Sequence, residues 1–229
     1  MKLLAIETAT EACSAALFNE GRCIEHYRLA PQEHNRLLLA MIEAVLAEAG
    51  ISFAQLDALA FGRGPGSFTG VRIAASVIQG LAFGADLPVV PVSTLAALAQ
   101  EALDETREDW AYTCIDARMG EVYWGVYRCN GAGYAELVGQ EAVLPADLVP
   151  FSEESRGIGI GSGWSRYRPQ LTERLSGRLA AVLSDRLPRA ASVAKLAADA
   201  LRSGATVSAE QALPVYLRDT VAAKPSPRR

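Results

Sequence analysis

The amino-acid sequence predicts an α/β protein made of two halves that repeat one order of elements. In the first half, three apolar or alternating runs precede alternating helix and strand patterns, and the second half begins again with strand, acid, turn and strand. A chain of 229 residues with 50% hydrophobic content is long enough to build two packed cores. We therefore expect two duplicated βββαβα-type domains, residues 1–105 and residues 106–229.

Three strands are expected at the start of the chain. Residues 2–7, 12–18 and 23–29 are apolar or alternating, and they are separated by residues that favour turns. A helix is expected over residues 33–49, and it ends at Gly50 because glycine is common just past a helix end. Its apolar positions are too many for the single stripe of a surface helix, which indicates that it is covered on two sides.

A glycine-rich turn, Gly62–Ile73, joins a short strand at 57–61 to a second helix at 70–83. Gly64 and Gly66 permit close backbone approach, and the exposed amides at a helix start favour an anion. One interpretation is therefore a cradle for a phosphate or carboxylate. The other is a tight turn that packs the strand against the helix, since the Gly-Lys-Ser/Thr ending of a P-loop is missing.

The two helices at 33–49 and 70–83 are also candidates for a partner-binding surface. The second helix is either buried within the monomer or part of an interface, and its polar stripe is narrow. We favour the interface because two helices on one face of a small sheet should not both be buried all round. The residues assigned to it are His34, Leu38, Met41, Ile42, Val45, Val71, Arg72, Ala74, Ala75 and Ile78, with His34 and Arg72 at the rim.

The remaining elements follow from the same kinds of pattern. Residues 88–92 are expected to form a buried strand and residues 94–105 a helix capped by Ser93 or Thr94, and the charge-rich residues 104–109 mark the domain boundary. In the second half we expect strands at 111–116, 121–127 and 134–140, a helical turn at 145–149, and a strand and glycine turn at 156–163. Helices are expected near 163–175 and 190–203, with an apolar run at 179–183 between them and an extended segment at 214–218 after them. The chain is expected to be flexible from about residue 219, and residues 224–229 form a basic tail.

Two acids, Glu7 and Asp116, are expected at equivalent ends of the first strand of each half, facing a shared cleft. Opposed carboxylates can hold a hydrated Mg²⁺ or act as acid and base, whereas the alternative is that each acid caps amides of its own hairpin. ATP or ADP with Mg²⁺ would be the ligands of such a site, and the residues assign no other cofactor. The candidate nucleotide or anion site comprises Glu7, Thr8, Gly64, Gly66, Ser67 and Asp116.

Composition narrows the classes of function. A net charge of −4 and a pI near 5.3 argue against a surface that holds nucleic acid by itself. The four cysteines form no CxxC pair or disulfide framework, so they are expected to be reduced, in the cytoplasm. Since His26 and His34 are too far apart for a zinc helix and no triad is indicated, we assign no catalytic or metal-binding residue. No run approaches the roughly 20 apolar residues that span a bilayer, so no membrane association is expected.

Four stretches, residues 4–14, 62–73, 116–124 and 214–218, resemble the TsaB (YeaZ) family, in order and over nearly the whole chain. The resemblance implies the actin-like ATPase fold (ASKHA, ribonuclease H-like). It also implies a role in making N6-threonylcarbamoyladenosine (t6A) in tRNA, as a non-catalytic subunit that pairs with its catalytic paralogue TsaD and is joined by the ATPase TsaE. Such a subunit forms a homodimer when alone, through the paired helices of the first domain, and meets tRNA through the complex.

The sequence departs from the family pattern at Glu7, where Asp is usual, and the extra methylene changes any phosphate or Mg²⁺ geometry there. Two other functions stay open. One is a small ATP-dependent phosphotransferase or ATPase that uses Glu7, Asp116 and the glycine turns. The other is a glycoprotease-like hydrolase, for which the sequence offers neither a metal pair nor a triad. We do not expect the chain to be an enzyme by itself.

Overall fold

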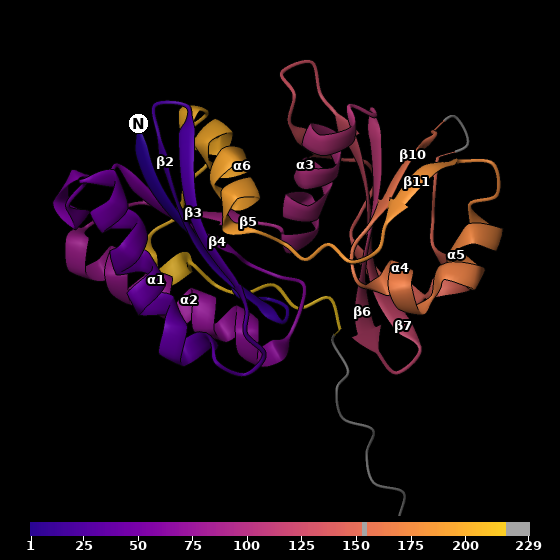
Figure 1. The fold of residues 1–229 in the computed structure, drawn as a ribbon, viewed down its shortest axis with the longest axis horizontal. Helices are drawn as coiled ribbons and strands as arrows, with labels where there is room; N and C mark the ends of the chain where they lie inside the picture. The colour runs from indigo at the N-terminus through magenta and orange to yellow at the C-terminus, as the bar shows by residue number, and fades with distance from the viewer. Residues whose placement is uncertain (153–154, 219–229) are drawn as a thin grey trace, which may run out of the picture.

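The computed structural model describes residues 1–152 and 155–218, and within these ranges the chain forms two lobes that lie side by side (Figure 1). The basic tail predicted from about residue 219 lies outside the described residues. The first lobe contains a five-stranded sheet in the order β3-β2-β1-β4-β5, in which β1, β2 and β3 are antiparallel and β4 and β5 run parallel to β1. Its strands are β1 (Lys2–Glu7), β2 (Ala12–Asn19), β3 (Arg22–Leu29), β4 (Ala58–Gly62) and β5 (Val89–Val92).

The second lobe repeats this plan. Its sheet has the order β11-β10-β6-β7-β8, with β9 paired to β7, and again antiparallel strands, here four because of β9, precede two parallel ones. The repeat confirms the predicted α/β class and the duplication of the two halves. Its strands are β6 (Trp110–Arg118), β7 (Glu121–Cys129), β8 (Ala135–Leu137), β9 (Ala142–Pro145), β10 (Gly157–Ile160) and β11 (Leu179–Leu183).

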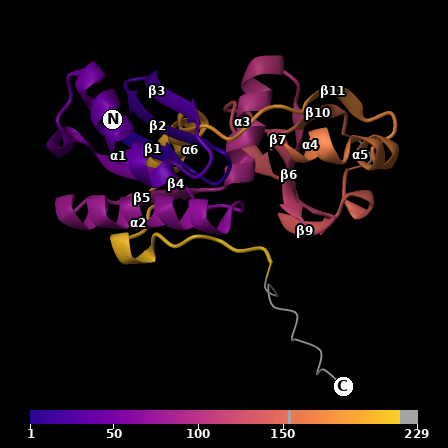
Figure 2. The same cartoon turned by 60° about the horizontal axis from the view of Figure 1, so that its bottom comes forward.

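Helices cover both faces of each sheet (Figures 1 and 2). In the first lobe, Leu4 and Ile6 of β1 point toward α1 (His34–Ala49) and α2 (Phe68–Ala85), whereas Leu3 and Ala5 point to the opposite face. The continuous apolar run of β1 follows from this arrangement, because a strand covered on both faces has no solvent side. In the second lobe, α4 (Gly163–Arg166), α5 (Arg168–Arg174) and the short helix Ala146–Leu148 lie on one face of the sheet.

The two remaining helices are exchanged between the lobes, which corrects the predicted domain boundary at residues 105 and 106. α3 (Thr94–Thr106) packs its leucines, among them Leu95 and Leu98, on the second sheet. α6 (Ala190–Arg202) returns to the first lobe and packs its alanines on the face formed by Leu3 and Ala5. Both helices are amphipathic, and an apolar stripe does not say which sheet covers it, so the sequence could not reveal the exchange.

Some local expectations also change. The apolar run at 179–183 is strand β11, β9 is a strand where none was expected, and the helix near 163–175 is divided at Tyr167, just before Pro169. The helical turn expected at 145–149 is confirmed as the short helix Ala146–Leu148. Short helices Phe53–Gln55 and Ala209–Gln211 complete the described chain.

α2 is 18 residues long and has a mean hydropathy of 1.3, which is enough to cross a membrane by length and composition alone. One side of the helix, including Ala74 and Ile78, is buried in the core of the first lobe. A core helix of a water-exposed protein meets the same criterion, so the finding gives only weak support for a membrane span. The exposed side of α2 carries the polar residues Thr69, Arg72 and Ser76 beside Phe68 and Phe83.

The helix exchange predicts that residues 1–105 do not fold as a unit. Without α6, the face of the first sheet that carries Leu3 and Ala5 would be exposed, and so would the leucines of α3. Fragment 1–105 should therefore show no cooperative thermal transition by circular dichroism. As a matched control, residues 1–93 joined to residues 186–218 by a flexible linker should unfold cooperatively. Cooperative unfolding of 1–105 alone would contradict the exchange.

Candidate functional site

The glycine turn packs directly on the segment between β1 and β2. The amide of Ser67 donates to the carbonyl of Ala9 at 2.7 Å, and the Thr8 hydroxyl donates to the carbonyl of Gly70 at 2.8 Å. A Cβ atom at Gly66 would lie 2.4 Å from the Ala9 carbonyl oxygen. The turn therefore matches the second interpretation, a close contact between strand and helix, because its groups face protein rather than an open cradle.

Ser67 is the N-cap of α2, where its Oγ accepts a hydrogen bond from the amide of Gly70 at 3.3 Å. This cap satisfies one of the free amides at the helix start, which an anion would otherwise have used. Gly64, with φ near +96°, lies beside Val71 and the carbonyl of Val215. The residues of the turn thus fix where α2 begins.

Glu7 lies at the end of β1 and is fully buried. Its Oε1 accepts a hydrogen bond from the amide of Ala9 at 2.6 Å, and its Oε2 accepts one from the hydroxyl of Thr94 at 3.0 Å. The carboxyl group also covers Gly62, where a Cβ atom would lie 1.9 Å from Oε2. Burial raises the pKa of Glu7 to about 7, although the hydrogen bonds from Ala9, Thr94 and Thr8 oppose this shift.

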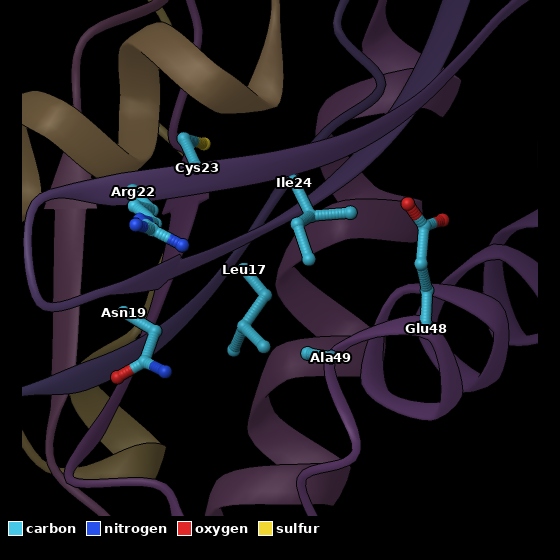
Figure 3. A pocket seen from close by; sticks show the side chains of 7 residues that line it. All are labelled: Leu17, Asn19, Arg22, Cys23, Ile24, Glu48 and Ala49. Carbon is cyan, nitrogen blue, oxygen red and sulfur yellow. The ribbon is translucent and has the colours of Figure 1, made fainter.

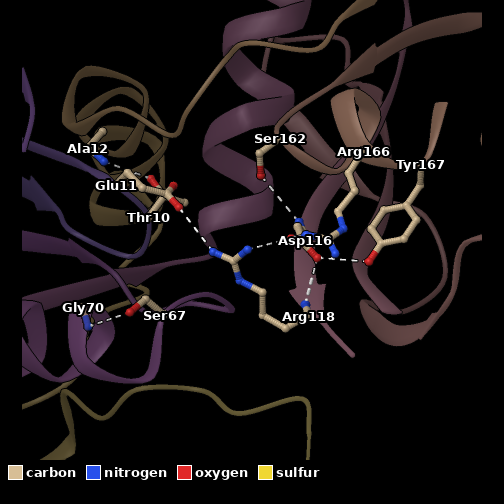
Figure 4. A network of polar contacts seen from close by, with 10 residues as sticks. All are labelled: Thr10, Glu11, Ala12, Ser67, Gly70, Asp116, Arg118, Ser162, Arg166 and Tyr167. Atoms are coloured by element: carbon tan, nitrogen blue, oxygen red, sulfur yellow. Dashed lines mark hydrogen bonds and ion pairs between the residues drawn. The ribbon is translucent and has the colours of Figure 1, made fainter. Parts of the chain in front are cut away.

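Asp116, at the end of β6, has a different set of partners (Figure 4). Its carboxylate oxygens lie 3.1 Å from Nη1 of Arg118, 3.4 Å from Nη1 of Arg166 and 3.2 Å from the hydroxyl of Tyr167. Arg118 also reaches Glu11 of the first lobe, with Nη2 3.7 Å from Oε1. The charge of Asp116 is therefore neutralised by two guanidinium groups.

These contacts do not fit the predicted nucleotide and Mg²⁺ site. The Glu7 carboxyl is enclosed by β1, Gly62 and Thr94, and the Asp116 carboxylate is occupied by arginines. A hydrated Mg²⁺ needs accessible carboxylate oxygens, which neither residue offers. Within residues 1–152 and 155–218, no three His, Cys, Asp or Glu side chains are grouped so that they could hold a metal ion. The structure thus brings the candidate residues to the lobe junction without forming the expected site.

The start of α3 holds a polar cluster that the sequence did not predict. Ser93 is the N-cap, and its hydroxyl also contacts the carboxylate of Glu141, which is almost fully buried. Glu141 further accepts a hydrogen bond from the hydroxyl of Tyr127 at 2.5 Å and lies 3.8 Å from Nη2 of Arg63. Because Arg63 belongs to the glycine turn, this cluster links the first lobe to the second. Glu141 lies in a loop with no recognisable motif, so no local signal could have revealed it.

A groove of about 610 Å³ lies elsewhere, between the β2–β3 hairpin and the last turn of α1 (Figure 3). Leu17, Ile24 and Ala49 contribute apolar atoms, and Asn19, Arg22, Cys23 and Glu48 contribute polar ones. None of the predicted site residues lines it. A second groove, of about 290 Å³, lies between Asn35 of α1 and the part of α2 from Phe68 to Val77. The predicted interface residue Arg72 lines it.

The predicted interface residues need a correction. All of them except Arg72 are buried within the monomer, so they have almost no surface left for a partner. They form the side of α1 and α2 that packs on the first sheet, because the most continuous apolar stripe of each helix is buried against that sheet. The buried residues are His34, Leu38, Met41, Ile42, Val45, Val71, Ala74, Ala75 and Ile78.

The opposite side of these helices nevertheless exposes large apolar side chains. Phe83 is 76% exposed, Phe68 55% and Leu39 52%. Arg72 is the only charged residue of α2. We call the exposed side of α1 and α2, with Leu39, Phe68, Arg72 and Phe83, the helix face.

Comparison with known proteins gives the family. Residues 26–226 match the family model described as TsaD: tRNA N6-adenosine threonylcarbamoyltransferase. The chain is 42% identical to the tRNA threonylcarbamoyladenosine biosynthesis protein TsaB of Escherichia coli strain K12, with 99% of each chain covered. The chain belongs to the TsaB (YeaZ) family. The TsaB of Haemophilus influenzae is 39% identical, with 100% of this chain and 98% of that protein covered.

A solved TsaB-family structure, YeaZ from Pseudomonas aeruginosa, has the same fold. It superposes with a TM-score of 0.88 at 48% sequence identity, covering 94% of this chain and 99% of that one. The fold described above is therefore shared with this TsaB-family structure. The match to YeaZ confirms the two-lobed α/β fold that the resemblance implied.

The packing of the glycine turn predicts opposite effects for two glycines of α2. In Gly70→Ala the new Cβ would lie 2.0 Å from the carbonyl oxygen of Thr8, which should destabilise the chain by about 3 kcal/mol or more. In Gly80→Ala nothing lies within 4 Å, so the variant should gain up to about 1 kcal/mol in helix propensity. Urea unfolding measures both values, and equal stability of the two variants would rule out the close contact.

The buried Glu7 carboxyl predicts a dependence on pH. Since its folded pKa, about 7, is above the ordinary value of 4.5, its contribution to stability is complete at low pH and is lost as pH rises through 7. Glu7→Gln keeps a neutral group there, so the variant should gain about 2.5 kcal/mol over the wild type between pH 5 and pH 8.5. The pKa of Glu101 is also raised to about 7 by burial, but that effect cancels in the difference. Parallel stability curves for the two proteins would refute the assignment.

Proposed function

We propose that the chain is a non-catalytic subunit of the complex that synthesises t6A in tRNA, and that it works by binding a catalytic TsaD-type paralogue through the helix face. The observation that carries the proposal is the exposure of Leu39, Phe68 and Phe83 on two neighbouring helices. An apolar surface of this kind on a folded chain is typical of a protein–protein contact. The link to t6A synthesis is supported by the TsaB relatives, which are named as tRNA threonylcarbamoyladenosine biosynthesis proteins.

The identity of the partner is supported by the family model. Because the model of a TsaD enzyme matches residues 26–226, a TsaD-type paralogue would carry an equivalent pair of helices in its own first lobe. Two such faces can pack together about an approximate two-fold axis, and a stable contact would bury about 1,600 Å² in total. The same face gives a homodimer when the paralogue is absent. In this proposal a TsaE-type ATPase joins the pair, tRNA binds the assembled complex, and the assembly works in the cytoplasm.

A scaffold role also agrees with the state of the two acids. Glu7 is buried against Gly62, and Asp116 is held by Arg118 and Arg166, so both carboxyl groups are engaged by groups of the chain itself. The catalytic group would then come from the paralogue. The contribution of this chain would be its surface and the fixed geometry of its lobes.

Replacing Phe83 by aspartate tests the helix face. The new charge would have to be desolvated in the contact, so Phe83→Asp should weaken binding of the TsaD-type paralogue at least about 30-fold, close to 2 kcal/mol. The melting temperature of the isolated variant should be unchanged, because Phe83 is exposed. Calorimetric titration measures the affinity, and reconstituted tRNA modification measures the consequence.

Leu148→Asp is the matched control, since Leu148 is 62% exposed but lies on the second lobe. It should bind the paralogue and support t6A synthesis like the wild type. If Phe83→Asp binds as tightly as Leu148→Asp, the helix face is not the docking surface. If omitting the whole chain leaves t6A synthesis unchanged, the proposed function is wrong. A charge at a core position of α2, such as Ala75, would not test the surface, because it would destabilise the lobe itself.

A further inference from the structure

The segment that follows α6 runs back along α2 (Figure 2). It pairs with the edge of the first sheet through Val207 and Val89, and it enters the core at Ala212, whose carbonyl accepts a hydrogen bond from the side chain of Gln79 at 3.2 Å. From there, residues Leu213–Arg218, which we call the strap, pass the glycine turn. The amide of Val215 donates to the carbonyl of Arg63 at 2.8 Å.

The middle of the strap joins the helix face. The ring of Tyr216 lies 5.7 Å from the ring of Phe68, and the tyrosine hydroxyl accepts a hydrogen bond from Nε of Arg72 at 2.9 Å. The guanidinium of Arg72 also lies over both rings, 3.3 Å and 5.4 Å from their centroids. Tyr216 is still 42% exposed, so this cluster of two aromatic rings and an arginine faces outward.

The end of the strap is attached to the second lobe. Nη1 of Arg218 donates to the carbonyl of Ala117 at 3.0 Å, and its Nη2 contacts the carboxylate of Glu121. Both acceptors flank the turn between β6 and β7, where Arg118 and Met119 adopt positive φ. The same turn supplies Arg118, which pairs with Asp116 and reaches Glu11 of the first lobe. The strap therefore connects the helix face to the ion pairs between the lobes.

We propose that the strap is a third element of the surface that receives the TsaD-type paralogue, with Tyr216 as its anchor, and that Arg218 transmits partner binding to the β6–β7 turn. This inference rests on the proposed function. Tyrosine and arginine are the side chains that most often dominate binding energy in interfaces, and the cluster is continuous with Phe68 of the helix face. Since Arg72 is the only charge on α2, the partner is expected to present an apolar helix with a carboxylate facing this guanidinium.

The experiment measures affinity of full-length variants for the TsaD-type paralogue by calorimetry. Tyr216→Ala should weaken binding about tenfold or more. Tyr134→Ala is the matched control, because the Tyr134 hydroxyl also accepts a hydrogen bond from an arginine, Arg202 at 2.6 Å, away from the strap. It should bind like the wild type. Tyr216→Phe, which keeps the ring, should lose less affinity than Tyr216→Ala.

Hydrogen exchange tests the transmission. Binding of the paralogue should slow exchange of the amides of residues 117–121 in the wild type, and this protection should disappear in Arg218→Met. If Tyr216→Ala binds like Tyr134→Ala while Phe83→Asp does not bind, the strap is not part of the surface, although the proposed function stands. If Phe83→Asp also binds normally, both proposals fail. Protection of the turn that persists in Arg218→Met would overturn the coupling.

Discussion

The carboxyl group of Glu7 lies where β1 ends, β4 passes and α3 begins, and much of the surrounding structure depends on how it is enclosed. It needs a glycine at position 62 because it occupies the space of a side chain there, and it holds the first turn of α3 through Thr94. The next two residues, Thr8 and Ala9, form hydrogen bonds with the glycine turn and the start of α2. A buried carboxyl is costly unless its oxygens are paired, so these contacts constrain one another.

The exchange of α3 and α6 extends this constraint to the whole molecule. Because each lobe completes its core with a helix from the other half of the sequence, neither half of the sequence has a complete core, and α3 and α6 contact each other where the lobes meet. Ion pairs join the lobes, including Arg63 with Glu141 and Arg118 with Glu11. They fix the orientation of one lobe relative to the other more than they add to the free energy of folding. The exchange therefore joins the two halves of the sequence into one folding unit.

The sequence was most informative where the structure is local. The β1–β2–β3 start, the glycine turn and the repeat of strand, acid, turn and strand depend on neighbouring residues, and all of them are present. The packing of α6 on the first sheet and the contacts of Glu141 join residues that are far apart in the sequence. The local spacing of apolar residues carries no information about such contacts. The apolar excess of α1 and α2 was recognised correctly, but the assigned residues were those facing the sheet. The exposed sides also carry large apolar residues, Leu39, Phe68 and Phe83, so composition alone did not separate the core side from the exposed side.

The two sides of α2 differ in exposure: one is buried in the core of the isolated chain, and the other is exposed to water. Ala74 and Ile78 are fully enclosed by the sheet and contribute to folding of the isolated chain. Phe68 and Phe83 are more than half exposed, so most of their apolar area would leave water only if another surface covered it. In the proposed function, folding and docking therefore depend on different residues of one helix. This separation allows a substitution on the outer side to change assembly alone, whereas a substitution on the inner side changes both.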